Sequence, residues 1–264
     1  MTATQVLPAT KTTRSDGYQY FATGLIENAK GDFATSRVLE YSIDDFAIAQ
    51  LASRLGDQDA YAFFSARSQN WMNVFDPQSQ HVMPRSRSGF DRSFDLRVRD
   101  DPAGRGQFNQ STGYQYGWLV PHNLSTLIAR RGGVSKATTS LDTLMAQLDA
   151  GAYTQTGNYL SNQPAFGTPW VYNWLQAPSK GTDVLYRAVE EMYDTTPTGL
   201  PGNDDQARSA PGTCSRTSAS TRRSTARATW SSARRCSIAS RSSRPVDRGT
   251  SRSGPPASLA VSGT

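Results

Sequence analysis

Cysteine is absent from the first 206 residues, and both cysteines of the chain, Cys214 and Cys236, lie near its C-terminal end. The main part of the chain therefore forms no disulfide, and cysteine use does not distinguish an oxidising from a reducing compartment. No stretch approaches the roughly 18 consecutive apolar residues of a membrane helix, and the mean hydropathy is -0.57. We expect no membrane partner.

Residues 1–16 are polar and lack the apolar core of a secretory signal. The chain as written is therefore expected to be cytoplasmic.

Acidic residues and lysine are almost missing from residues 207–264. This segment holds 11 arginines and one aspartate, a formal charge of +10, so residues 1–206 carry −4 of the total of +6. Arginine and serine without apolar periodicity predict a disordered tail. One interpretation is a basic arm that binds an anionic surface or nucleic acid. Aromatic residues that could stack on bases are missing there apart from Trp230, so nucleic acid is not an expected partner.

Strand patterns are also lacking, and apolar residues recur instead at helical spacing. Residues 1–31 and 78–105 are predicted to be loops. Asp57 is expected to cap the second helix, after a link short enough to make the first two helices antiparallel. Helices are predicted over residues 37–55, 60–75, 112–131 (kinked at Pro121), 140–148 and 182–193, with a broken helix over 160–175. Paired helices with alternating short and long loops indicate an all-α fold, such as a barrel of helix pairs.

Two segments combine polar groups with rings or carboxylates in the first half of the chain. In residues 40–45, Glu40 and Asp44 share one helix face at positions i and i+4; a solvated face is the plain alternative. Residues 108–123 interleave aromatic rings with amides. That pattern is typical of a sugar site, because sugars present apolar CH faces and hydroxyl groups, although the same rings could form core.

Two further segments follow in the second half. Residues 161–164 (Ser-Asn-Gln-Pro) precede a run of aromatic residues that begins at Trp170. Residues 199–205 (Gly-Leu-Pro-Gly-Asn-Asp-Asp) combine a tight backbone path with two adjacent carboxylates. The last segment is either a polar turn or an active-site loop that carries a general base.

Together and in this order, these segments resemble glycoside hydrolase family 92, the exo-acting α-mannosidases. The resemblance covers roughly residues 17–206, and its matching pieces are residues 36–45, 75–77, 83–85, 114–122, 161–164 and 199–205. It implies a β-sandwich followed by an (α/α)6 barrel, a requirement for Ca²⁺, and inversion at the anomeric carbon. Residues 1–206 would then be an incomplete (α/α)6 barrel, and intact relatives would be secreted.

The resemblance also assigns roles by position. Asp205 matches the carboxylate that activates water, and Asn203 and Asp204 stand beside it. Asn162 and Gln163 fall where the family places residues of its calcium site, and amide oxygens of this kind suit Ca²⁺. The residues expected to contact the sugar are Tyr114, Gln115, Trp118, His122, Trp170 and Asn203.

Gln110 departs from the family pattern, since it occupies the position of the general acid, normally a Glu. An inverting glycosidase needs an acid to protonate the leaving oxygen, and Gln cannot supply that proton. A phosphate leaving group is stable as an anion, with a second pKa near ~6, and needs no such acid. The expected substrate is a mannose-containing glycan or a mannosyl-phosphate, and Gln110 predicts a preference for mannose-α-1-phospho-mannose. The alternative is a decayed site.

The tail has a second interpretation. Family members continue after Gly-Asn-Asp-Asp with a segment near Leu-Ser-Ala-Trp-Tyr-Val-Phe-Ser. Permitted codons for residues 208–222, when read two nucleotides later, encode Leu-Ser-Ala-Trp-Tyr-Val-Phe-Ser-His-Ile-Gly-Leu-Tyr-Pro. We therefore interpret residues 207–264 as out-of-frame translation and expect the chain as written to be poorly folded and inactive. The competing class is a non-enzymatic binding protein with a basic tail.

Overall fold

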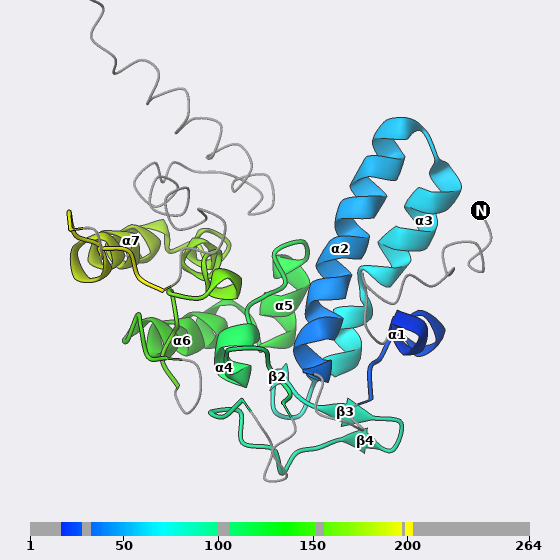
Figure 1. Ribbon diagram of the computed structural model, residues 1–264, viewed down its shortest axis with the longest axis horizontal. Coiled ribbons are helices and arrows are strands. Elements are labelled where there is room, and N and C mark those ends of the chain that lie inside the picture. Colours follow the sequence, from blue (N-terminus) through cyan, green and yellow to red (C-terminus); the bar gives the residue numbers. More distant parts are fainter. Residues whose placement is uncertain (1–16, 28–32, 100–105, 152–155, 197–198, 203–264) are drawn as a thin grey trace, which may run out of the picture.

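The computed structural model describes residues 17–27, 33–99, 106–151, 156–196 and 199–202, which are mainly helical, as predicted (Figure 1). The predicted tail, 207–264, lies outside the described residues. In the described part, no helix is long and apolar enough to cross a bilayer. The helices are α1 (Gly17–Thr23), α2 (Ala34–Leu55), α3 (Gln58–Arg67), η2 (Asn70–Val74), α4 (Gly113–Tyr116), α5 (Leu124–Arg130), α6 (Val134–Met145), η3 (Gln163–Ala165), η4 (Thr168–Asn173) and α7 (Pro178–Met192).

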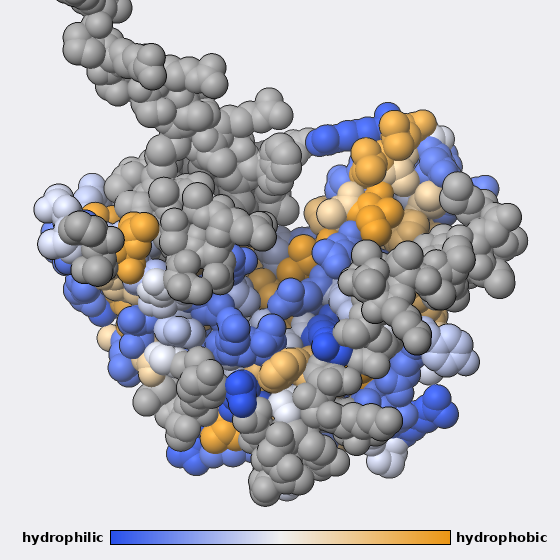
Figure 2. All heavy atoms as spheres, viewed as in Figure 1, coloured by the Kyte–Doolittle hydropathy of each residue, from blue (hydrophilic) through white to orange (hydrophobic). Residues whose placement is uncertain are grey.

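Helices α2 and α3 form the antiparallel pair that the sequence predicts, and they lie side by side in Figure 1. Gly56 ends α2 in a left-handed conformation, with φ 78°, which glycine adopts without a steric penalty. The Asp57 side chain then accepts a hydrogen bond from the Ala60 backbone N–H at 2.9 Å and caps α3. Apolar surface remains exposed at the far end of this pair, where Leu51 and Leu55 are 57% and 75% exposed (Figure 2).

Several predicted helices are shorter or more divided than expected. The helix predicted over 60–75 ends at Arg67 and gives way to the 3₁₀ turn η2. The helix predicted over 112–131 is two helices, α4 and α5, with Pro121 between them, because proline lacks the N–H that a continuous helix requires. Helix α1 forms where a loop was predicted, and the broken helix of 160–175 is the pair of 3₁₀ helices η3 and η4.

The predicted loop 78–105 partly consists of two short hairpins, which the sequence pattern did not predict. Strand β1 (Phe75–Asp76) pairs antiparallel with β2 (His81–Val82), and β3 (Arg85–Ser86) pairs with β4 (Gly89–Phe90). The Arg92 guanidinium donates to both carboxylate oxygens of Asp76, at 2.8 and 3.0 Å. The Asp76 side chain is fully buried, and its ion pair with Arg92 links β1 to the residues that follow β4.

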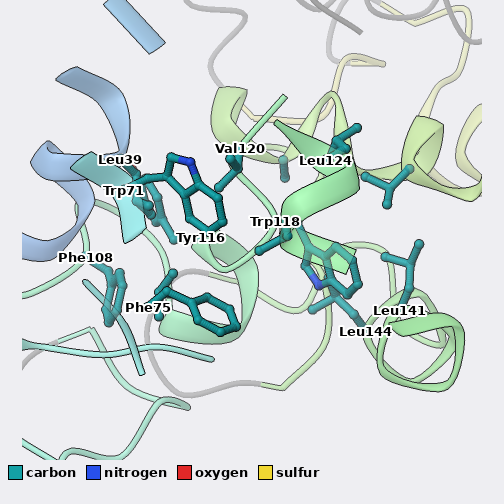
Figure 3. Packing of buried hydrophobic residues seen from close by; sticks show 14 of the residues in the cluster. Leu39, Trp71, Phe75, Phe108, Tyr116, Trp118, Val120, Leu124, Leu141 and Leu144 are labelled. Carbon is teal, nitrogen blue, oxygen red and sulfur yellow. The ribbon is translucent and has the colours of Figure 1, made fainter. Parts of the chain in front are cut away.

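One hydrophobic core extends from α1 to α7. Figure 3 shows Trp71, Leu39 and Tyr116 packed together on the α2 side. Trp118 lies two residues beyond Tyr116 and faces Leu141 and Leu144 of α6 in the same view. The aromatic residues of segment 114–118 therefore connect the two helical regions.

Candidate functional site

A pocket of about 330 Å³ opens where α2, the loop before α4, and η3 meet. Its lining residues come from segments that are far apart in the sequence: Glu40, Ile43, Asp44, Asn109, Gln110, Tyr116, Leu119, Asn162, Gln163 and Pro164. Three of the four segments singled out in the sequence, 40–45, 108–123 and 161–164, contribute to it. The predicted acid-position residue Gln110 and the predicted calcium-site residues Asn162 and Gln163 all line it.

A short hydrogen-bond network joins Gln110 to Asn162. Gln110 has φ 52°, a left-handed backbone conformation that non-glycine residues rarely adopt. The Asn162 Nδ2 group donates to the Gln110 carbonyl oxygen at 2.9 Å and to Ser111 Oγ at 3.0 Å. Asn162 Oδ1 accepts from the Gln163 backbone N–H at 3.1 Å. Asn162 is thus a buried brace that positions the Gln110 loop against η3.

Glu40 provides a carboxyl group in the same pocket. The hydroxyl of Tyr116 donates to Glu40 Oε1 at 2.7 Å. Glu40 is open to solvent on the pocket side, but protein atoms around it partly desolvate the carboxylate and raise its pKa. The Tyr116 hydrogen bond opposes this shift, and the negative charge of Asp44 adds to it. The pocket therefore holds a carboxyl group that takes up a proton more readily than an ordinary glutamate.

The described lining of the pocket includes two carboxylates. Glu40 and Asp44 lie one turn apart on α2, and none of the described lining residues is Lys, Arg or His. The remaining polar side chains of the described lining are amides and the Tyr116 hydroxyl, so the available metal ligands are oxygens, as hard divalent cations prefer. Among the described residues, no group of three or more His, Cys, Asp or Glu side chains is placed to hold a metal ion. A cation here would therefore depend on amide and backbone oxygens as well as on carboxylates.

The fourth segment approaches the same place. Gly202, the last described residue before the tail, has φ 71°. A Cβ atom at Gly202 would stand 2.4 Å from the Ser161 carbonyl oxygen, so only glycine fits against the residue that precedes Asn162. The predicted base Asp205 and its neighbours Asn203 and Asp204 lie outside the described residues.

Two predicted sugar-contact residues have structural partners outside the pocket. Gln115 is buried and completes a capping box with Thr112, while its Nε2 group donates to the carbonyls of Gly151 and Gly157 at 2.9 and 3.0 Å. Trp118 is buried, and the Arg131 guanidinium carbon lies 4.1 Å from its ring centroid. Neither residue lines the pocket. The alternation of rings and amides in this segment thus serves mainly to fold it.

Three other predicted sugar-contact residues, Tyr114, His122 and Trp170, are described and also lie outside the lining set. The Tyr114 ring packs edge-on against His81, with centroids 5.2 Å apart. His122 hydrogen-bonds through Nε2 to the Ser68 carbonyl at 2.8 Å, and burial lowers its pKa. Trp170 is half-buried in η4. The described pocket thus offers carboxylates and amides to a ligand, with only Tyr116 as an aromatic lining residue.

Sequence reasoning did not select Glu40 as a site residue. The available signal was its i, i+4 spacing from Asp44, which a solvated helix face explains equally well. The contact that distinguishes the two cases comes from Tyr116, 76 residues further along the chain.

Comparison with known proteins shows the family of the chain. Residues 2–210 match the glycosyl hydrolase family 92 catalytic domain. An uncharacterized secreted glycosidase of Arthroderma benhamiae is 28% identical over 209 residues, which is 71% of this chain and 25% of that protein.

Solved structures give the same result. The fold superposes with a TM-score of 0.63 on a family GH92 α-mannosidase of Bacteroides thetaiotaomicron in complex with mannoimidazole, at 28% identity over 71% of this chain and 26% of that one. A family GH92 inverting mannosidase of the same organism shares the fold at 23% identity and a TM-score of 0.63, over 76% of this chain and 29% of the other.

The match over residues 2–210 places the chain among the glycoside hydrolases. The chain belongs to glycosyl hydrolase family 92. It spans about a quarter of the length of the relatives that it matches.

Proposed function

We propose that residues 1–206 are part of the catalytic domain of a calcium-dependent, inverting α-mannosidase, and that the described helices belong to its (α/α)6 barrel. The observation that carries this proposal is the pocket itself. At the pocket, the Asn162 side chain donates a hydrogen bond to the Gln110 carbonyl, 52 residues away in the sequence. Gly202, in the carboxylate-bearing segment 199–205, packs against Ser161, which precedes Asn162.

Asp205 is the proposed general base. It follows Gly202 by three residues, and an extended chain of that length spans at most about 11 Å. Gly202 packs against Ser161, the residue before Asn162, so the proposal requires Asp205 to bridge no more than this length of chain. In an inverting reaction this carboxylate removes a proton from water as the water attacks the anomeric carbon. Asp204 and Asn203 would support it from the same segment.

Calcium is proposed from the family and from the oxygen donors of the pocket. Asn162 Oδ1 has one acceptor site left after its bond to the Gln163 N–H, and the Gln163 side chain lines the pocket. These two residues would face the ion. When bound, Ca²⁺ would hold the terminal mannose through its hydroxyl oxygens and offset the charges of Glu40 and Asp44.

The leaving group is proposed to be a phosphate. Gln110 lines the pocket, and its amide can donate a hydrogen bond to a phosphate oxygen but cannot protonate a departing alkoxide. A mannosyl phosphodiester can lose its phosphate as a stable anion, so C–O cleavage does not depend on an acid at this position. We therefore propose mannose-α-1-phospho-mannose as the substrate class, in place of simple mannose-containing glycans.

A protein with the complete catalytic domain and the restored reading frame tests this proposal. It should release mannose from mannose-α-1-phospho-mannose and act at least about 100-fold more slowly on α-1,2-mannobiose, because a missing general acid costs roughly 10²–10⁴ in rate. Gln110→Glu should raise activity on the disaccharide. Fast disaccharide hydrolysis by the unmodified protein, with little phosphodiester hydrolysis, would refute the substrate assignment.

A further inference from the structure

We propose that Ser36, in the first turn of α2, is a positioning residue for the reaction. Its hydroxyl holds the Gln110 loop (residues 106–111) in the place from which Gln110 lines the pocket. This inference rests on the proposed function and deepens it. It gives a role in the reaction to a residue that lies outside the described lining of the pocket.

The first turn of α2 has backbone N–H groups that the helix itself does not satisfy. The first four N–H groups of a helix lack an intrahelical acceptor, and Phe33, at the N-cap, makes no side-chain capping bond. The Gln110 loop provides acceptors instead: the Ser36 N–H donates to the Gln107 carbonyl at 3.1 Å, and the Phe33 N–H donates to the Gly106 carbonyl at 2.9 Å. Thr35 Oγ1 also donates to Gln107 Oε1 at 2.9 Å. The loop therefore caps α2, and α2 fixes the start of the loop.

The Ser36 hydroxyl extends this contact to the residue directly before Gln110. The Asn109 backbone N–H donates to Ser36 Oγ at 3.1 Å. Ser36 Oγ uses its own hydrogen to donate to the Phe33 carbonyl at 3.0 Å, so its lone pairs face the loop. Ser36 is 1% exposed, and water does not easily replace a partner that is lost at a buried position.

The Gln110 loop is buried where it meets α2 and exposed where it meets the pocket. Residues 106–108 are buried, whereas Asn109 and Gln110 are exposed and line the pocket. Gln110 has φ 52°, a conformation that a non-glycine residue rarely keeps without support. Asn162 supports it from the η3 side, and Ser36 supports it through Asn109 from the α2 side. Loss of the Ser36 hydroxyl would therefore release one of the two supports of Gln110.

A displacement of Gln110 should affect the rate of reaction more than substrate binding. In the proposed reaction its amide donates to the phosphate leaving group, which gains negative charge as the C–O bond breaks. A contact that is strongest in the transition state raises kcat with little effect on KM. A shift of about 1 Å in such a group can cost up to about 100-fold in rate.

Steady-state kinetics test this inference on the complete catalytic domain with the restored reading frame. Ser36→Ala removes the acceptor of the Asn109 N–H and places a good helix former in α2. It should lower kcat on mannose-α-1-phospho-mannose by about 5-fold to 20-fold and leave KM within about twofold. Ser42→Ala is the matched control, because Ser42 is also buried on α2 but donates to the Val38 carbonyl of the same helix. It should change kcat by less than about twofold.

A double-mutant cycle separates positioning from general damage to the fold. Gln110→Ala removes the group that is positioned, so Ser36→Ala should lower kcat by less than about twofold in that background. A merely structural defect would lower kcat by the same factor in both backgrounds. The inference is wrong if the two factors multiply, if Ser36→Ala alone leaves kcat unchanged, or if Gln110→Ala does. A preference for α-1,2-mannobiose would refute the proposed substrate, and the same cycle on that sugar would still decide the role of Ser36.

Hydrogen–deuterium exchange tests the contact itself without hydrolysis. Mass spectrometry on the 264-residue chain and on the complete domain should show that Ser36→Ala speeds exchange within residues 106–111 at least about 10-fold, because the Asn109 N–H loses its acceptor. Residues 134–145 of α6 should exchange as before, and Ser42→Ala should change neither segment. Unchanged exchange within residues 106–111 would overturn the inference. An inactive domain would refute the proposed function and leave this measurement to decide the placement of the loop.

Discussion

Asn162 should be the residue on which the geometry of the pocket depends most. Its buried amide makes three hydrogen bonds: to the Gln110 carbonyl, to Ser111 Oγ and to the Gln163 N–H. It also holds Gln110 at φ 52°, a conformation that costs a non-glycine residue roughly 1–2 kcal/mol. Removing the amide breaks the bonds and releases the strained residue.

The expected cost can be worked from these contacts. A typical hydrogen bond contributes about 0.5–1.5 kcal/mol, and a buried group left without a partner costs about 1–3 kcal/mol. Release of the Gln110 strain returns part of this. We expect Asn162→Ala to lower the free energy of unfolding by about 2–4 kcal/mol in urea denaturation. Asn162→Asp should cost a similar amount, because a carboxylate oxygen would face the Gln110 carbonyl in place of the N–H donor.

A double-mutant cycle separates bracing from general packing. Gln110→Gly removes the steric cost at φ 52°, so Asn162→Ala has no strain to release in that background. The cost of Asn162→Ala should then rise by about 1 kcal/mol. If the stability costs of Asn162→Ala and Gln110→Gly add to within about 0.3 kcal/mol in the double mutant, the two residues are not coupled. Asn173→Ala, in η4 and away from the pocket, is the control and should cost under about 1 kcal/mol. A cost of Asn162→Ala no larger than this control would refute the brace itself.

Three further predictions follow from other parts of the chain. Burial, and then the positive charge of Arg131, lower the pKa of His81 to about 4. In the unfolded chain the imidazole titrates near ~6.5. The stability that neutral His81 contributes is therefore complete above pH ~6.5 and is lost as the pH falls toward 4. The chain has two histidines, so an NMR titration should show two imidazole signals, and a His81 midpoint at or above 6.5 would contradict the prediction. The Arg92 hydrogen bonds hold the pKa of Asp76 far below its usual range, so Asp76 stabilises the fold above the unfolded pKa near ~3.9 and loses this effect as the pH falls further. Asp76→Asn should cost about 2–4 kcal/mol at pH 7 in urea denaturation, and a cost below about 1 kcal/mol would argue against the ion pair. The gene should show a one-base insertion or deletion near codon 206. Sequencing of independently cloned DNA tests this. If no reading frame after codon 206 encodes Leu-Ser-Ala-Trp-Tyr-Val-Phe-Ser, the frameshift interpretation is wrong.

The sequence determined those features that depend on neighbouring residues. The α2–α3 pair was predictable because its apolar spacing, the Gly56 end and the Asp57 cap act within one or two helical turns. The family was recognisable because its motifs are short and keep their order along the chain. The two-residue strands and the 3₁₀ helices were not predictable, since segments this short have no periodicity to detect.

Only the tertiary structure decided which polar residues form the pocket. The sequence predicts Gln115 as a sugar ligand, and that role stays a prediction; in the structure its amide donates to the carbonyls of Gly151 and Gly157, 36 and 42 residues away. Glu40 looked like a surface residue, yet Tyr116 makes it part of the pocket. In both cases the sequence supplies the same polar groups for either role. Which role each takes depends on partners that only folding brings within hydrogen-bond distance.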